Sequence, residues 1–295
     1  MAEGARKAMR ARLEWRLGGR SGGRVLALGE RTFVMGVLNV TPDSFSDGGK
    51  FFAVGAAVAH GLRMLDEGAD LLDVGGESTR PGATEVDVEE EMSRVVPVIA
   101  ALRAARPDAL LSVDTTKARV ARAAVAAGAE IVNDVSGLMW DDAMAAACAE
   151  LKCGVVATHS RGRPTEWKGQ ARLKRAEVVP LVRAGLEASL VRARAAGILE
   201  EAQAVDPGFG FGKRGEENYW LLAGMAELGE LRRPVVAGVS RKSFLGQAAD
   251  PEARLQASIA ATVATVLAGA YVVRVHDVRP VVEALRVADA ILAAE

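Results

Sequence analysis

The chain has 295 residues, of which 50% are hydrophobic and 25% are charged, a composition typical of a globular protein with a large buried core. Its formal net charge of -1 at pH 7 argues against a nucleic acid or an anionic membrane surface as partner. Two cysteines and three histidines do not supply a zinc site of usual spacing, and so few cysteines suit the reducing cytoplasm. The longest apolar stretch, residues 259–275, falls short of the ~20 residues that cross a bilayer, so we expect no membrane segment.

Residues 1–32 form an arginine-rich, acid-poor segment whose composition resembles that of an organelle transit peptide. The segment shows no cleavage pattern, and Trp15 stands among alternating apolar residues, as in a strand with one buried face. We therefore predict an N-terminal extension or surface hairpin over residues 1–32 and a single domain over residues 33–295.

One pattern recurs through that domain. An alanine-rich helical stretch is followed by Gly-Ala, four or five mainly apolar residues and a polar residue, as in DEGADLLDVGG, AAGAEIVNDVSG and LAGAYVVRVHD. A glycine just after a helix takes the left-handed conformation that ends it. A continuous apolar run suits a parallel strand that is buried on both faces. The pattern therefore predicts repeated βα units.

Eight strands alternate with eight helices when this pattern is followed along the chain. The strands are predicted at residues 34–39, 71–75, 110–114, 131–134, 154–159, 204–206, 234–239 and 271–276. The helices are predicted at residues 53–67, 88–105 (with Asp87 and Glu90 as a capping pair), 117–127, 141–152, 177–196, 216–228, 251–268 and 280–294. Eight such units favour a single α/β domain, a (β/α)8 TIM barrel. A doubly wound open sheet is the alternative, because periodicity alone does not show closure.

Every predicted strand carries a polar residue at or just after its carboxyl end, the end of a barrel where the active site lies. These residues are Asn39, Asp73, Asp114, Asn133 with Asp134, His159, Asp206, the segment SRKS at 240–243, and Arg274 with His276. A single polar residue there often only ends a strand or caps a helix, which we expect of Asp134, Ser136 and Asp141. Strand ends and helix caps do not readily explain polar residues at the same end of all eight strands, because several of them would be buried charges without a ligand.

Four of these positions predict a site for a flat heterocycle. They offer acceptors and donors toward the barrel axis, and they are Asp114, Asn133, Asp206 and Lys242. One carboxylate can accept two adjacent N–H groups of a ring. The glycine-rich segment DPGFGFGK lacks the Ser or Thr of a P-loop. Its glycines instead allow close approach to a flat ligand, with Phe209 available to pack on the ring.

Two alternate residues of the last strand predict an anion site. Arg274 and His276 point to the same face, and the loops after strands seven and eight are where barrels usually hold phosphate. Both side chains would then contact the same anion. The alternative is that Arg274 pairs with a nearby acid such as Asp277.

Six segments, in this order and spacing, resemble the signature segments of the dihydropteroate synthase family: NVTPDSFSDGG, DVGGESTRPGA, SVDTTK, DPGFGFGK, SRKS and RVHD. The resemblance implies a pterin-binding barrel, the target of sulfonamides, in folate biosynthesis. Such an enzyme condenses 6-hydroxymethyl-7,8-dihydropterin diphosphate with p-aminobenzoate to give 7,8-dihydropteroate and pyrophosphate, with the help of Mg²⁺. The resemblance also implies a homodimer, and the apolar surface predicted for the helix at residues 251–268 suits burial beyond one barrel wall.

The resemblance assigns roles to individual residues. The pterin would lie among Asp114, Asn133, Asp206 and Lys242, and the diphosphate would be held by Asn39, Thr79, Arg274 and His276. Asn39 would also contact Mg²⁺, which prefers phosphate oxygens and water and needs few protein ligands. Two loops would close over p-aminobenzoate with Phe45, Asp47, Thr79, Arg80 and Pro81, helped by Phe209 and Ser243.

The predicted catalytic set is Asp114, Lys242, Arg274 and His276. Arg274, His276 and the metal would stabilise the charge of the leaving pyrophosphate, while Asp114 would lie beneath the cation left on the pterin methylene. We therefore predict a largely dissociative substitution without a covalent enzyme intermediate.

The chain departs from the family after the fifth strand, where the family commonly has Met-His-Met-Gln-Gly and this chain has THSRG. Thr158 replaces the sulfur that would pack on the pterin, and Arg161 is expected to add a charge near the rim. Two alternatives stay open, a pterin-binding methyltransferase barrel and a non-catalytic pterin-binding paralogue. Both predict that no pyrophosphate is released from the two substrates.

Overall fold

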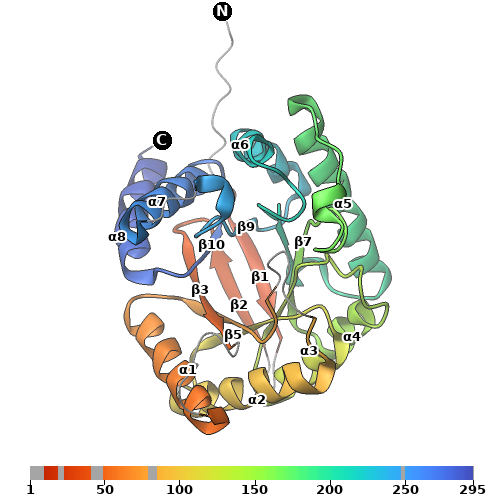
Figure 1. The fold of residues 1–295 in the computed structure, drawn as a ribbon, viewed down its shortest axis with the longest axis vertical. Coiled ribbons are helices and arrows are strands. Elements are labelled where there is room, and N and C mark those ends of the chain that lie inside the picture. The colour runs from red at the N-terminus through yellow and green to blue at the C-terminus, as the bar shows by residue number, and fades with distance from the viewer. Residues whose placement is uncertain (1–9, 19–22, 41–48, 79–84, 247–249, 295) are drawn as a thin grey trace, which may run out of the picture.

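The computed structural model describes residues 10–18, 23–40, 49–78, 85–246 and 250–294. Eight parallel strands form a nearly closed barrel within a ring of helices (Figure 1). The strands hydrogen-bond in the order β8-β7-β6-β5-β4-β3-β10-β9, and a bridge between Val205 and Val235 joins the two ends. The strands are β3 (Phe33–Asn39), β4 (Leu71–Gly75), β5 (Leu110–Asp114), β6 (Ile131–Asp134), β7 (Gly154–Thr158), β8 (Gln203–Asp206), β9 (Val236–Ala237) and β10 (Val272–Val275). The predicted barrel is confirmed, and the open sheet is wrong.

The helices lie between consecutive strands and pack outside them (Figure 1). They are α1 (Gly49–Asp66), α2 (Val88–Ala105), α3 (Ala118–Ala127), α4 (Met144–Leu151), α5 (Arg175–Ala195), α6 (Glu216–Ala223), α7 (Pro251–Leu267) and α8 (Val278–Ala293). The predicted cap of α2 is confirmed, since Asp87 accepts a hydrogen bond from the backbone N–H of Glu90 at 2.8 Å. Among the described residues, no helix combines the length and the apolar character needed to cross a membrane.

An antiparallel hairpin precedes the barrel and consists of β1 (Leu13–Leu17) and β2 (Arg24–Leu28). Trp15 is fully buried and donates from its indole N–H to the carbonyl of Ala202 at 3.1 Å. The apolar residues of the hairpin belong to one buried cluster with an inward residue from every barrel strand, namely Met35, Leu71, Leu110, Ile131, Val156, Ala204, Val236 and Val272. The hairpin therefore has one buried face and closes the amino-terminal end of the barrel.

The interior of the barrel changes from apolar to polar along the strands. Because side chains alternate in direction, residues two positions beyond the apolar layer also point inward. That next layer contains Val37, Asp73, Ser112, Asn133, Thr158, Asp206, Gly238 and Arg274. The layer beyond it contains Asn39, Gly75, Asp114 and His276. The register thus gathers the predicted polar residues at the carboxyl end of the barrel.

Candidate active site

Arg274 connects the predicted heterocycle site with the predicted anion site at the mouth of the barrel. Arg274 donates from Nε to Asp73 Oδ2 at 2.6 Å and from Nη2 to Asp114 Oδ2 at 2.7 Å. The side chain of Asn133 donates to the same oxygen of Asp73 at 2.9 Å. Arg274 thus pairs with acids, but not with Asp277, whose carboxylate is held by another arginine.

Burial and pairing set the charges of this cluster. Burial raises the pKa of Asp114 to about 7, although the neighbouring Arg274 lowers it. Burial opposes the charge on Arg274, but Asp73 and Asp114 raise its pKa above the ordinary value, so it stays a cation. Removing one member of such a buried set leaves an uncompensated charge, which is strongly destabilising.

Asp206, at the end of β8, and Lys242, after β9, share this mouth. A methyl group placed on Gly238 would lie 3.9 Å from Asp206 Oδ2 and 3.7 Å from Arg274 Cβ. Asp206 accepts a hydrogen bond from the backbone N–H of Gly208 at 2.7 Å. Burial raises the pKa of Asp206, against the effects of that N–H group and of Lys242. The structure therefore brings the four predicted ring-binding residues to one end of the barrel.

Three buried polar atoms in the barrel interior have no hydrogen-bond partner among the described residues: Asp73 Oδ1, Ser112 Oγ and Asn133 Oδ1. Asp73 and Ser112 stand opposite each other in the β4–β5 ladder. Buried polar atoms are nearly always bonded to protein or water, so unpartnered ones indicate a place for ligand or water atoms. These atoms suit the polar edge of a heterocycle.

The aromatic residue presented beside Lys242 is Phe211 and not the predicted Phe209. The ammonium of Lys242 lies 4.0 Å from the centre of the Phe211 ring, and Phe211 is only partly buried. Phe209 is 0% exposed and stacks on Phe244, with ring centres 6.1 Å apart. The ring of Phe209 is therefore part of the core in this structure, and Phe211 is the better placed of the two for a substrate ring.

A buried lysine fixes the loop that carries Phe211. Lys213 donates to the backbone carbonyls of His159 and Phe211, both at 3.2 Å, and lies 2.9 Å from Nδ1 of His159. Burial lowers the pKa of Lys213 to about 7 and that of His159 to about 2. His159, the predicted tip of the fifth strand, therefore supports the glycine-rich loop as a neutral imidazole.

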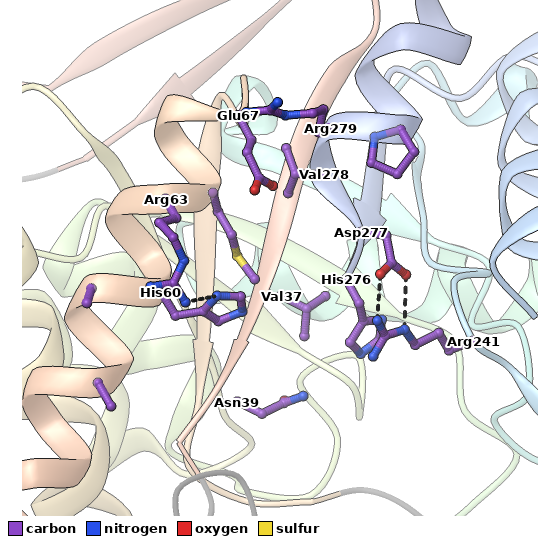
Figure 2. A pocket seen from close by; sticks show the side chains of 14 residues that line it. Val37, Asn39, His60, Arg63, Glu67, Arg241, His276, Asp277, Val278 and Arg279 are labelled. Carbon is purple, nitrogen blue, oxygen red and sulfur yellow. Dashed lines mark hydrogen bonds and ion pairs between the residues drawn. The ribbon is translucent and has the colours of Figure 1, made fainter. Parts of the chain in front are cut away.

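The anion side of the mouth contains Asn39, His276 and Arg241, which line a cavity of about 850 Å³ (Figure 2). Ser240 Oγ accepts from the backbone N–H of His276 at 3.3 Å and lies 3.1 Å from its Nδ1. The hydroxyl of Ser240 can then donate to Nδ1, which leaves Nε2 protonated. Burial, together with Arg274, lowers the pKa of His276 to about 3. His276 is thus neutral and can serve as a donor to an anion.

Some predicted residues lie outside the described part of the chain. They are the lid residues Phe45, Asp47, Thr79, Arg80 and Pro81. Ser243 is described and starts a short 3-10 helix, Ser243–Leu245, directly after Lys242. The described residues contain no group of three or more histidine, cysteine or acidic side chains that could hold a metal ion. Asn39 carries a side-chain oxygen and lines the cavity beside His276, so it fits Mg²⁺ as one ligand beside substrate oxygens.

The capping roles expected of the remaining strand-end residues are confirmed. Asp134 accepts from the backbone N–H groups of Ser136 and Leu138 at 2.7 and 3.1 Å. Asp141 accepts from Ala118 and Ala143 at 2.8 and 2.9 Å. These carboxylates are occupied by backbone donors and do not belong to the site.

The sequence profile of the family described as "Pterin binding enzyme" matches residues 35–276. The chain belongs to this family. It is 46% identical to the dihydropteroate synthase of Escherichia coli (strain K12) over 264 residues, which cover 89% of this chain and 92% of that protein. Its fold matches a Xanthomonas albilineans dihydropteroate synthase structure with 4-aminobenzoic acid (TM-score 0.86, 48% identity, 95% and 99% coverage). It also matches a structure of the X. albilineans enzyme with 7,8-dihydropteroate (TM-score 0.82, 45% identity, 94% and 99% coverage).

The residue that departs most from the family pattern has a structural role. The side chain of Arg161 is 9% exposed and donates to the carbonyls of Gly212 at 3.1 Å and Ala171 at 3.0 Å. It also lies 3.7 Å from the carboxylate of Glu217, at the start of α6. The charge of Arg161 is thus held against Glu217 and two backbone carbonyls. Arg161 fastens the loop after β7 to the glycine-rich loop after β8, since the carbonyls that accept its hydrogen bonds belong to both.

Three residues carry no assigned role in the sequence-based prediction, although the site depends on them: Asp73, Phe211 and Ser240. Asp73 is an acid within an apolar run, a signal for a buried pair. Phe211 and Phe209 are two positions apart in GFGF, and nothing local distinguishes the buried ring from the presented one. Ser240 shows its role only through its contact with His276.

Proposed function

We propose that the chain condenses 6-hydroxymethyl-7,8-dihydropterin diphosphate with p-aminobenzoate, giving 7,8-dihydropteroate and pyrophosphate in folate biosynthesis. The observation that carries the proposal is the position of Arg274, which bonds to the predicted pterin ligand Asp114 and stands two residues from the predicted diphosphate ligand His276. A molecule with a heterocycle at one end and a diphosphate at the other would contact both groups at once.

The pterin end of the substrate would lie over the Asp114 and Asp206 carboxylates. Paired N–H groups of the ring would bond to these acids and to the unpartnered oxygen of Asn133. Arg274 Nη2 donates to Asp114 Oδ2 at 2.7 Å. We infer that Nη2 of Arg274 turns from Asp114 to the diphosphate as the ring binds, while Nε stays bonded to Asp73, which positions the guanidinium.

The diphosphate end would be held by Arg274, Asn39 and the neutral imidazole of His276. Negative charge grows on the diphosphate as the bond to the pterin methylene breaks, and fixed donors stabilise that charge. Asn39 would hold Mg²⁺ together with substrate oxygens, and the ion would supply further positive charge to the leaving group.

The carbon left behind is an electron-poor methylene conjugated with the dihydropterin ring, and the Asp114 carboxylate beneath it supplies counter-charge. The amine of p-aminobenzoate then attacks this carbon, and its proton leaves to water or to the site. The ring of p-aminobenzoate would pack against Phe211. The ammonium of Lys242, 4.0 Å from the centre of that ring, would attract the benzoate carboxylate of the substrate or of the product. No nucleophilic side chain is needed, so we propose a largely dissociative substitution without a covalent intermediate.

A homodimer is also proposed, through the outer surfaces of α7 and α8. The α8 residues Val287 and Ile291 are 63% and 44% exposed, and α8 packs beside α7 along the outside of the barrel (Figure 1). Exposed apolar side chains on one face favour association. Light scattering at micromolar concentration should give twice the chain mass, and a monomer would refute the dimer.

The two cysteines support a cytoplasmic location. Cys148 and Cys153 are buried free thiols and form no disulfide, and Cys153 Sγ donates to the carbonyl of Cys148 at 3.8 Å. Structural disulfides are common in oxidising compartments and rare in the cytoplasm.

The decisive experiment measures pyrophosphate after the purified chain is mixed with both substrates and Mg²⁺. Pyrophosphate and 7,8-dihydropteroate should form in equal amounts, and D206N should lose most of the activity. A methyltransferase barrel or a non-catalytic pterin-binding protein would release none. Retained binding of the pterin without pyrophosphate release would select the non-catalytic alternative.

A further inference from the structure

The barrel wall opens on the anion side. The ladder between β10 and β3 ends with the pair Val275 and Gly36, whereas β3 stays paired with β4 as far as Asn39 and Gly75. The last residues of β3 therefore have a strand neighbour on one side only. The cavity of about 850 Å³ lies at this seam.

The cavity extends well beyond the predicted diphosphate ligands. Its inner end holds Asn39, His276 and Arg241. Its outer end is built by α1 and by the start of α8, which contribute His60, Arg63, Met64, Glu67, Arg279 and Pro280. Figure 2 shows His60 and His276 on opposite sides of the cavity, Arg63 next to His60, and Glu67 and Arg279 together at the end away from Asn39.

The charges of the outer end favour an anion. Neither Arg63 nor Arg279 forms an ion pair within the described part of the chain, whereas the charge of Arg241 is offset by Asp277 at 2.6 Å. One acid, Glu67, also lines the outer end. Two arginines against one carboxylate leave a net positive chamber, and arginine is well suited to phosphate oxygens.

His60 supplies a neutral donor at the outer end, on the side that faces His276 (Figure 2). Arg63 Nη2 lies 3.3 Å from Nδ1 of His60, so that nitrogen accepts and Nε2 carries the proton of the neutral ring. Burial, and then the charge of Arg63, lowers the pKa of His60. The side chains from His276 through His60 to Arg63 and Arg279 thus offer donors to an anion along the whole cavity.

We propose that the outer end of this cavity is a second anion site, which receives the pyrophosphate as it leaves the inner end between α1 and α8. This inference rests on the proposed function, because that reaction releases a diphosphate from the inner end of the cavity. Ligand pockets of roughly 300–1,000 Å³ hold drug-sized molecules, so a cavity of about 850 Å³ has room for a diphosphate beyond the inner ligands. The anion moves from one set of donors to the next without passing through the mouth.

The test uses inorganic pyrophosphate and the histidine ring signals in an NMR titration of the full chain. The chain has three histidines, His60, His159 and His276, so H60Q identifies the signal of His60. The His60 signal should shift as pyrophosphate is added, together with that of His276, while that of His159 stays in place. A shift of His276 alone would overturn the proposal.

Binding measurements provide a second, independent readout. R63A and R279A should each weaken pyrophosphate binding by about threefold to tenfold, as expected for one charged contact near a surface. The matched control is R119A, which removes an exposed arginine of α3 that pairs with Glu89 of α2 and does not line the cavity. Equal affinities for R63A, R279A and R119A would also overturn the proposal.

Turnover separates this proposal from the proposed function. In the active enzyme, R63A and R279A should need about threefold to tenfold more pyrophosphate for half-inhibition, with unchanged KM for p-aminobenzoate. An enzyme that turns over but shows unchanged product inhibition refutes the second site alone. A chain that binds pyrophosphate at His60 but releases none from the substrates refutes the reaction alone.

Discussion

Strands β4 to β8 pair with their neighbours up to the predicted pterin ligands Asp114, Asn133 and Asp206, whereas β3 and β10 separate before the predicted diphosphate ligands Asn39 and His276. Asp114 stands in register with both Gly75 and Asn133, and Asp206 with Thr158. On the other side, Asn39 and His276 both lie beyond the last β3–β10 pair.

With the ligands proposed above, the two substrate ends would be recognised in different ways. Ladder hydrogen bonds fix the backbone beneath the pterin ligands, so their geometry is preorganised. The cavity on the anion side is lined by side chains from α1, α8 and the loop after β9, and we expect these to adjust as a phosphate arrives and leaves. Ligands on a fixed backbone suit a flat ring of one shape, and side chains that adjust suit a leaving group.

The largest effect is expected where the two sides meet. R274K keeps a positive charge but loses the planar fork that reaches Asp73 and Asp114 together. We expect kcat/KM to fall by about two to three orders of magnitude, because one fixed donor to developing charge is worth that much. The pyrophosphate assay measures the effect, with R119K as control. A loss below tenfold would show that the two sides work without this connection.

The pterin side should depend on pH through Asp114. Its pKa of about 7 lies above the ordinary value, so the carboxylate becomes protonated as the pH falls below about 7 and loses acceptor capacity. Affinity for a pterin should then fall by up to about tenfold per pH unit on the acid side. Calorimetry with 6-hydroxymethylpterin measures this without the ionisations of a diphosphate. Constant affinity from pH 5.5 to 8 would contradict the assignment.

Substitutions of the two phenylalanines of the glycine-rich loop should have different effects, one on substrate binding and one on stability. F211L should raise the KM for p-aminobenzoate several-fold with little change in stability, since Phe211 is partly exposed beside Lys242. F209L should lower the free energy of unfolding by about 1–2 kcal/mol, because it changes the shape of a fully buried ring site. Steady-state kinetics and denaturant unfolding of both variants separate the roles. The reverse pattern would restore Phe209 as the substrate contact.

The smallest effect is expected at Arg161. R161Q introduces the glutamine common in the family and removes the contacts to Ala171, Gly212 and Glu217 that the longer side chain makes. We expect a loss of about 1–2 kcal/mol, or a few degrees in Tm, with activity within threefold. Thermal unfolding measures it, with R163Q, at an exposed position, as control. Equal Tm values for both variants would show that the contacts of Arg161 do not stabilise the fold.

Much of the fold could be predicted because its signals are local. The strands at Leu71–Gly75, Leu110–Asp114 and Ile131–Asp134 have the predicted bounds, since buried parallel strands read as short apolar runs. The prediction was less accurate at β9, expected over residues 234–239 but observed only as Val236–Ala237. The length of a ladder depends on its neighbours, and β9 stands where the barrel closes through a single bridge.

The sequence by itself determined the order of strands and helices and the placing of a polar residue after each strand, because apolar periodicity and glycine positions act within a few residues. It also carried the family's motifs for both substrates. Only the tertiary structure decided that Arg274 joins Asp73 to Asp114, that Phe211 and not Phe209 faces Lys242, and that the wall opens between β3 and β10. These outcomes depend on the register and the burial of segments that are distant in the sequence. Arg274 and Asp73, for example, are 201 positions apart, and no local pattern contains that information.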